Sequence, residues 1–283
     1  MKTFFGIILI FLLLVQCSSE PDSRSGKSGT VAINHRKVYF EEFGQGPPLI
    51  ILSGGGLNRS TKDFEKCIPF LSAHFRIILP DTPGQGRSEQ TDSLSYALLT
   101  DVMSQLVDSL RLDSTYVMGL SDGGIVSILL AERRPDKVRK AIAVGANNGT
   151  AGFILPEGFN LDSIKMPSAE EWARYHEKDI EWYDALEPKK DWRLMATNLN
   201  RMWYAKHYFA NTVYDHITIP VMIVIGDRDD ISIDHAQEMY RSIKGSQLCI
   251  LPNTSHEVFA EQPEIISKIA TRFFVESNGV AEP

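Results

Sequence analysis

Short apolar runs alternate with longer amphipathic segments from Val31 to near the end of the chain. Six of these runs have the length of strands and end in glycine, proline or polar residues, at 47–56, 75–83, 115–120, 139–147, 219–226 and 247–252. Apolar residues recur at helical spacing in the segments at 61–74, 96–112, 124–138, 234–244 and 263–277. This alternation predicts a parallel sheet with helices between its strands, preceded by a hairpin at 31–44.

Contiguous apolar residues, such as those at 221–225, predict strands that are buried on both faces, as in a doubly wound sheet. The predicted fold class is therefore α/β with a mostly parallel sheet. Residues 150–215 break the alternation, because they hold no convincing buried strand but all four tryptophans, which are Trp172, Trp182, Trp192 and Trp203. We predict a helical cap there, inserted between the core segments 30–149 and 216–283.

The charge of the chain limits its partners. With 29 basic and 36 acidic residues its formal net charge is −7, and no cluster of Lys and Arg stands out. Nucleic acid is therefore not an expected partner. Sites for small-molecule ligands are concave and often lie between a cap and a scaffold, so we expect a small-molecule ligand between the predicted cap and the sheet. Most of the cap aromatics are expected to form its own small core, with a few facing the pocket; Trp203 and His207 are the candidates for substrate contact.

The N-terminus predicts export. Residues 1–16 have an early Lys and an apolar run that is too short to span a membrane, which is typical of a signal peptide. The letters LVQC resemble a bacterial lipobox, so Cys17 is a candidate for lipid modification, although Gln16 departs from the usual small residue; the alternative is a stray cysteine beside a cleavage site. The polar stretch 17–29 is predicted to be a flexible tether. We expect a lipid-anchored protein of the bacterial cell envelope. That compartment permits a disulfide between Cys67 and Cys249, but the presence of two cysteines does not imply one.

The letters GLSDGG at 119–124 predict a nucleophile. Gly119, Ser121 and Gly123 fit the pattern G-x-S-x-G, and the motif lies between a predicted strand and a predicted helix. A strand that turns directly into a helix holds its serine in a strained backbone conformation, where nearby side chains would clash. The helix N-terminus also directs backbone N–H groups toward a developing oxyanion.

Serine needs a base and an orienting acid. His256 follows the last predicted strand, in a loop that can carry its side chain back over the sheet. The acid is expected in the loop after 221–226, where Asp227, Asp229 and Asp230 lie. Asp229 is preferred because the loop needs a residue or two before a side chain can reach the imidazole, whereas Asp227 suits a turn and Asp230 a helix-side or solvent-facing position.

An oxyanion hole needs two N–H donors. The first is expected from Asp122, the residue after the nucleophile, and the second from the glycine loop that follows the first buried strand. Gly55 is the preferred donor and Gly56 the alternative, unless the three glycines serve only a tight turn.

Taken in order, SGGG, DTPGQGRS, GLSDGG, GDRDD and NTSHEV resemble the α/β-hydrolase superfamily with a helical cap. The likeness covers about residues 30–275. It implies a Ser121–His256–Asp229 triad and no metal or organic cofactor. Ser53 departs from the His often found before the glycine loop, and Ser121 argues against the haloalkane dehalogenases of the family, which carry an aspartate nucleophile.

The letters SDGG, followed by VGANN, most resemble the biphenyl-hydrolase-like branch. That resemblance implies hydrolysis of a small carboxylic ester, in which Asp122 can receive the ammonium of an α-amino ester. The alternative is that the Asp122 side chain only caps the helix. Carbon–carbon bond hydrolysis, lactone hydrolysis and aminopeptidase activity use the same triad and stay open, as does a binding protein without activity.

Overall fold

The computed structural model describes residues 26–155, 165–186 and 189–276. The predicted signal peptide, Cys17 and residues 17–25 of the predicted tether lie outside the described residues. The prediction of a flexible tether up to residue 29 is wrong at its end, because residues 27–29 pair with the next strand as part of a β-strand that begins at Lys27. Among the described helices, none has both the length and the apolar character needed to cross a membrane.

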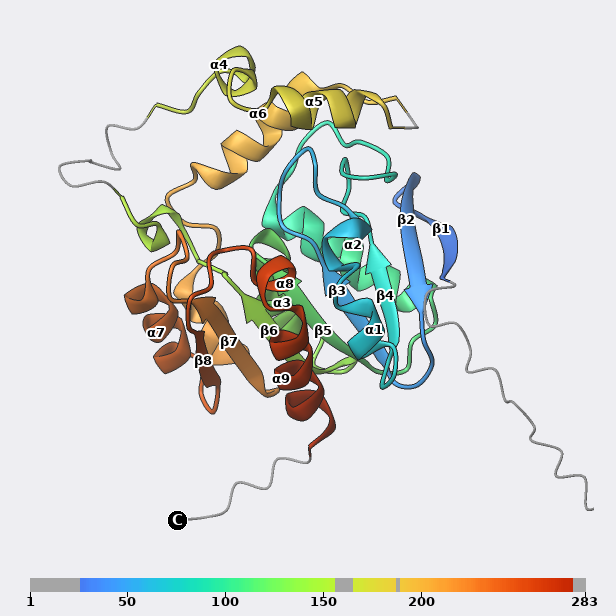
Figure 1. Cartoon of the computed structure of the whole chain (residues 1–283), viewed down its shortest axis with the longest axis vertical. Coiled ribbons are helices and arrows are strands. Elements are labelled where there is room, and N and C mark those ends of the chain that lie inside the picture. Colours follow the sequence, from blue (N-terminus) through green and yellow to red (C-terminus); the bar gives the residue numbers. More distant parts are fainter. Residues whose placement is uncertain (1–25, 156–164, 187–188, 277–283) are drawn as a thin grey trace, which may run out of the picture.

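Eight strands form one sheet in the order β1-β2-β4-β3-β5-β6-β7-β8 (Figure 1). β1 and β2 form the predicted hairpin, β2 also pairs antiparallel with β4, and the other neighbours are parallel. The strands are β1 (Lys27–Ile33), β2 (Arg36–Phe43), β3 (Pro48–Leu52), β4 (Arg76–Pro80), β5 (Thr115–Leu120), β6 (Val138–Val144), β7 (Val221–Gly226) and β8 (Gln247–Leu251).

Helices cover both faces of this sheet. The helices of the described chain are α1 (Ile68–Leu71), α2 (Tyr96–Ser109), α3 (Asp122–Arg133), α4 (Ala169–Ala173), α5 (Glu177–Asp184), α6 (Trp192–Trp203), α7 (Ile233–Ser242), α8 (Val258–Glu261) and α9 (Pro263–Val275). Short 3₁₀ helices are η1 (Thr61–Phe64), η2 (Thr150–Gly152) and η4 (Asn211–His216). Successive residues of one strand enter two separate cores: Ile50 and Leu52 face α2 and α3, while Leu49 and Ile51 face η1, α1 and α9. The contiguous apolar runs are thus buried on both faces, as predicted.

The segment 61–74 differs from its prediction. Apolar residues at helical spacing predicted a helix, but the chain forms η1 and the four-residue α1 instead. Pro69 lies in the first turn of α1. Proline has no N–H to donate and clashes with the preceding turn, so one continuous helix through Pro69 is excluded.

Helices α4, α5 and α6 lie together beyond one end of the sheet (Figure 1). Trp172 and Tyr183 from this segment are buried and belong to the same apolar cluster as α2 and α3. An isolated bridge between Phe153 and Ile231 ties the chain entering this segment to the loop after β7. Cys67 and Cys249 are both free thiols in the structure, which resolves the pairing that the sequence left open.

Candidate active site

Ser121 occupies the turn between β5 and α3 in a backbone conformation that serine rarely adopts. Its φ is 53° and its ψ is −118°. A Cβ built on Gly119 would overlap the backbone of Gly123, and one built on Gly123 would overlap the backbone of Leu52 and Ser53. Both glycines are therefore required by the close approach of strand and helix. A strained serine at this turn is the predicted nucleophile elbow.

The carboxyl ends of three strands meet beside Ser121. The Ser121 N–H donates to the Val144 carbonyl at 2.7 Å, and the Gly145 N–H donates to the Val224 carbonyl at 2.9 Å. A Cβ built on Gly145 would lie 3.0 Å from His256 Nδ1 and 3.2 Å from Asp229 Oδ2. The backbone at Val144 and Gly145 thus lies between Ser121 and the His256–Asp229 pair.

His256 and Asp229 form the predicted pair. His256 Nδ1 lies 2.8 Å from Asp229 Oδ1, and the Asp229 side chain is fully buried. Asp229 Oδ1 also accepts the Ile231 N–H at 2.9 Å, which fixes the carboxylate in its loop. Asp229 Oδ2 is buried with no hydrogen-bond partner in the described residues. This arrangement places a proton on Nδ1 and leaves Nε2 unprotonated in the neutral imidazole.

The two neighbouring aspartates lie where the sequence reasoning put them. Asp227 is exposed, and its Oδ1 accepts the Thr254 N–H at 3.1 Å, which closes the turn beside the His256 loop. Asp230 is exposed and lies at the wall of the cavity described below. Glu261, which ends α8, accepts from both the N–H and the hydroxyl of Ser255. The two residues before His256 are therefore both fixed by carboxylates.

The surroundings of His256 raise its pKa. Burial alone lowers the pKa of this imidazole, but the hydrogen bond and charge of Asp229 and the charge of Glu257 raise it more, so the net change is upward from the ordinary 6.5. Arg59 acts in the opposite direction, as a nearby positive charge. The imidazole is thus a stronger base than a free histidine.

The glycine loop after β3 passes directly beside the elbow. A Cβ built on Gly54 would lie 3.3 Å from the Ser121 Cβ. Gln85, which is 2% exposed, donates its Nε2 to the Gly54 carbonyl at 2.8 Å. In a trans peptide the N–H points opposite to the carbonyl, so this bond turns the Gly55 N–H away from Gln85. The assignment of Gly55 as the second oxyanion donor, with Gly56 as the alternative, stays a prediction.

The Asp122 side chain has a fixed place among aromatic residues. Its Oδ1 accepts from the Tyr96 hydroxyl at 2.8 Å, and the Trp203 Nε1–H lies 3.0 and 3.1 Å from its two oxygens. Burial raises the pKa of Asp122, and the bonds from Trp203 and Tyr96 oppose that rise. The helix cap considered as the alternative is not formed, because both donors come from distant side chains. Asp122 instead connects the elbow to α2 and to the end of α6.

A cavity of about 420 Å³ opens next to Ser121 and Asp122. Its walls combine aromatic and aliphatic side chains with a few polar groups: Tyr96, Asn147, Thr150, Phe153, Ile154, Leu155, Trp203, Tyr204, Tyr208 and Asp230. The predicted contact residue Trp203 is therefore at the cavity, but His207 is exposed and absent from the lining. The neighbouring Tyr208 lines the cavity instead, and its hydroxyl donates to the Trp203 carbonyl at 2.9 Å. In the described ranges no cluster of three or more His, Cys, Asp or Glu is arranged to hold a metal ion.

Sequence reasoning missed Tyr96, Gln85 and Tyr208. Gln85 and Tyr96 act through hydrogen bonds that join segments far apart in the chain, to Gly54 and to Asp122, and the Tyr208 ring packs against that of Tyr96. Gln85 had a partial signal, since a buried glutamine in the glycine-rich turn after a buried strand needs a polar partner.

The model of a family described as alpha/beta hydrolases matches residues 49–269. The chain belongs to the α/β-hydrolase family. A pimeloyl-[acyl-carrier protein] methyl ester esterase of Neisseria meningitidis is 26% identical over 243 residues, which cover 80% of this chain and 92% of the relative. The human serine hydrolase BPHL is 23% identical over 257 residues, which cover 87% and 86%. The similarity to BPHL supports the biphenyl-hydrolase-like branch.

A solved structure has the same fold. The meta-cleavage product hydrolase from Pseudomonas fluorescens IP01 superposes with a TM-score of 0.70 at 19% identity, and the match covers 87% of this chain and 97% of the other. The fold class predicted from the sequence is therefore confirmed. Together with the family match, the named relatives establish that this α/β-hydrolase is an enzyme of the hydrolase class.

Proposed function

We propose that this protein is a serine hydrolase that cleaves small carboxylic esters through an acyl-enzyme. The observation that carries the proposal is the positive φ of Ser121 at the end of β5, with only β6 between β5 and β7, the strand after which Asp229 pairs with His256. A binding protein gains nothing from a strained serine beside a paired histidine, whereas an acyl-transfer enzyme needs both.

The geometry supports a definite role for each group. Ser121 Oγ attacks the ester carbonyl while His256 Nε2 takes its proton, since Nδ1 is engaged by Asp229. The backbone N–H groups of Asp122 and Gly55 stabilise the oxyanion of the tetrahedral intermediate. His256 then gives the proton to the leaving alcohol, and water, activated by the same imidazole, hydrolyses the acyl-enzyme.

The charge of the cavity favours a neutral or cationic acyl group. Asp122 and Asp230 contribute carboxylates to the lining, and neither Lys nor Arg is among the lining residues. A substrate carboxylate would be repelled there, while an ammonium would be attracted. An α-amino ester is therefore our preferred substrate, with its ammonium near Asp122. The Trp203 and Tyr96 hydrogen bonds would orient the Asp122 carboxylate for that contact.

The location is a separate proposal. The lipobox-like residues before Cys17 support a lipid-anchored enzyme of the cell envelope. Trp203 of α6 lines the cavity, which supports helices α4–α6 as its cap. Radioactive palmitate should label the exported protein but not its Cys17→Ser variant, and equal labelling of the two would contradict the anchor.

The test of the activity is an ester panel. Wild type should react with a fluorophosphonate probe and hydrolyse p-nitrophenyl esters, while Ser121→Ala should do neither. The panel includes a lactone and a pair of substrates that differ only in the α-amino group, measured also with Asp122→Asn. A selective loss on the amino ester supports the ammonium contact. Equal losses on both esters would remove it, and a wild type inert to the probe would overturn the serine mechanism.

A further inference from the structure

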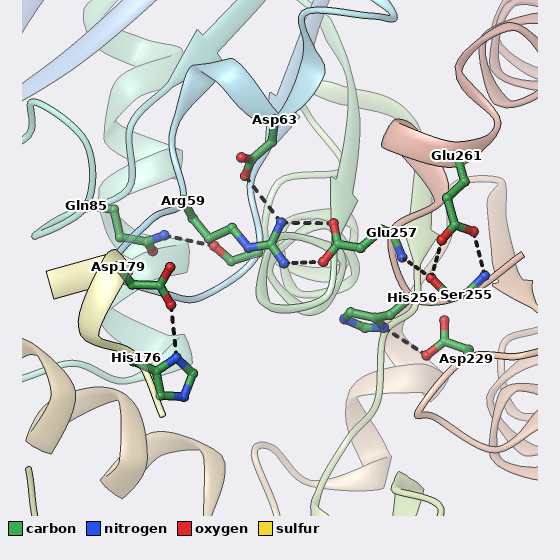
Figure 2. Close-up of polar contacts among 11 residues, drawn as sticks. Arg59, Asp63, Gln85, His176, Asp179, Asp229, Ser255, His256, Glu257 and Glu261 are labelled. Atoms are coloured by element: carbon green, nitrogen blue, oxygen red, sulfur yellow. Dashed lines mark hydrogen bonds and ion pairs between the residues drawn. The ribbon is translucent and has the colours of Figure 1, made fainter. Parts of the chain in front are cut away.

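An ion pair joins the glycine loop to the loop of the predicted base. Arg59 follows the glycines after β3, and Glu257 is the residue directly after His256. The guanidinium and carboxylate meet as a fork: Nη1 donates to Oε2 at 3.0 Å, and Nη2 donates to Oε1. Figure 2 shows this pair beside the His256–Asp229 pair. Residues 198 positions apart are thus brought into a planar, directional contact.

Glu257, rather than Asp63, is the hydrogen-bonded partner of Arg59. Asp63 Oδ2 lies 3.9 Å from Arg59 Nη1, and burial raises the pKa of Asp63 to about 6. For Glu257 the hydrogen bond from Arg59 lowers the pKa despite partial burial. The carboxylate next to His256 therefore keeps its charge at neutral pH and remains paired with Arg59.

The segments that follow Arg59 and Glu257 also meet, through a ring contact and a hydrogen bond. The Phe64 and Phe259 rings pack edge to face, with centroids 5.0 Å apart, and Lys66 Nζ donates to the Ala260 carbonyl at 2.9 Å. These contacts involve η1 and α8, which lie just beyond Arg59 and Glu257 in the chain. They hold the elements together but do not orient the residues next to the chemistry. The fork does so, because it ends one residue from His256.

We propose that the Arg59–Glu257 pair is a positioning element that sets the spacing between the Gly55 oxyanion donor and the His256 base. The inference rests on the proposed function. The fork also directs the Glu257 carboxylate toward Arg59 and so prevents it from taking the place of Asp229 beside the imidazole. Neither residue is assigned a contact with the substrate.

The charges around His256 provide a signature that a merely structural contact would lack. Four charged groups act on the imidazole: Asp229 from the loop after β7, Glu257 from its own loop, Arg59 from the glycine loop and Asp122 from the elbow. The Glu257 charge raises the pKa of His256 and the Arg59 charge lowers it. Removing one partner leaves the other unbalanced, so the two removals displace the titration of His256 in opposite directions.

The experiment compares Arg59→Met, Glu257→Gln and the double variant with wild type. Each single variant should lose about tenfold in kcat with little change in KM, because misalignment affects the reaction more than binding. The acidic limb of the pH profile of kcat/KM should shift to higher pH in Arg59→Met and to lower pH in Glu257→Gln. The double variant should lose no more kcat than either single variant, since both remove one shared contact.

Two further variants separate charge from geometry. Arg59→Lys keeps the charge but loses the fork, so its pH limb should stay near that of wild type while kcat falls. The matched control is Glu42→Gln, which breaks a similar fork between Glu42 of β2 and Arg76 of β4. Arg76 is the first residue of β4, so this fork lies at the opposite end of the sheet from Ser121. That control should alter neither kcat nor the pH limb. Displacement of the limb in the same direction by both single variants, or full activity in Glu257→Gln, would overturn the proposal.

The titration of His256 is also measured directly, by NMR of its Cε1–H without substrate. This readout does not depend on ester hydrolysis, so it separates the two proposals. Should wild type be inert to esters and to the fluorophosphonate probe, the proposed function fails, and opposite displacements of the His256 titration still support the electrostatic link. Unchanged titration in both single variants contradicts the link whatever the activity.

Discussion

The carboxyl edge of the sheet and the α4–α6 segment meet at the same cavity, but they are built by different means. At the sheet edge, backbone groups position the chemistry: Gly119 and Gly123 are required by close approach, and Ser121 has a positive φ. The α4–α6 segment is held by side chains, as when the Tyr183 hydroxyl donates to the Gly84 carbonyl at 2.6 Å and Trp203 donates to the Asp122 carboxylate.

This difference predicts what each region tolerates. A backbone that passes within van der Waals distance of another backbone cannot accept an added Cβ, so substitutions at the sheet edge alter folding or abolish the reaction. A side-chain contact can be replaced by another of similar shape, so substitutions in α4–α6 should change substrate preference by smaller factors. The experiments below test this division from the largest expected effect to the smallest.

Replacement of the nucleophile should have the largest effect. Ser121→Ala and Ser121→Gly should both lose about 10⁴-fold or more in kcat/KM, because the acyl-enzyme cannot form. The glycine variant should be more stable than the alanine variant by about 1 kcal/mol, since glycine adopts a φ of 53° without strain. Steady-state kinetics and urea unfolding measure the two effects, and equal stability of the variants would contradict the strain at the elbow.

An added methyl group at the elbow should lower the free energy of unfolding. In Gly119→Ala the new Cβ overlaps the Gly123 backbone, and we expect a loss of about 3 kcal/mol or more in the free energy of unfolding. Gly245→Ala is the matched control, because Gly245 has a φ of +74° but no atom within 4 Å of its built Cβ. The control should lose only about 1 kcal/mol from backbone strain. Similar losses in the two variants would mean that close approach is not the cause.

Acid should inactivate the enzyme through His256. The base must be neutral to accept the Ser121 proton, and its pKa is raised above 6.5, so kcat/KM should begin to fall at a pH above 6.5. Below that pKa the fall is about tenfold per pH unit, because one proton blocks the base. A pH profile with a stability control at each pH measures the limb. An acidic limb centred below pH 6.5 would show that burial lowers the pKa of His256 by more than the carboxylates raise it.

Loss of the α6 contact should have the smallest effect. Trp203→Phe removes the Nε1–H donor to Asp122 but keeps an aromatic ring at the cavity wall. We expect an increase of about fivefold in KM with kcat nearly unchanged, since one hydrogen bond to a charged group is lost while Tyr96 still donates. Trp192→Phe, elsewhere in α6, is the control. A large loss of kcat in Trp203→Phe would show that the α6 contact contributes to the reaction step rather than to substrate preference.

Strand order explains how much of the site could be predicted. Ser121, Asp229 and His256 each follow an apolar strand, and the carboxyl ends of neighbouring parallel strands meet at one edge, so sequence patterns brought the three together. The doubly wound fold was predicted for the same reason. Their roles in catalysis stay predictions until the variants are measured.

Contacts between side chains of distant segments could not be predicted in this way. Nothing in the periodicity relates Arg59 to Glu257, or Trp203 to Asp122, because these pairs depend on how the loops and α6 pack in three dimensions. His207 was expected to line the pocket from the predicted cap, but the neighbouring Tyr208 lies there instead. In irregular segments there is no period to tell which side of the chain faces inward.

The bond between Trp203 and Asp122 has an optical consequence. The indole N–H donates to a buried carboxylate whose backbone belongs to the residue directly after Ser121. A ligand that binds beside Ser121 changes the polarity and charge next to this indole, and tryptophan emission responds to both. The difference in fluorescence between wild type and Trp203→Phe thus provides an intrinsic probe of cavity occupancy, with which acylation can be followed in real time without a chromogenic leaving group.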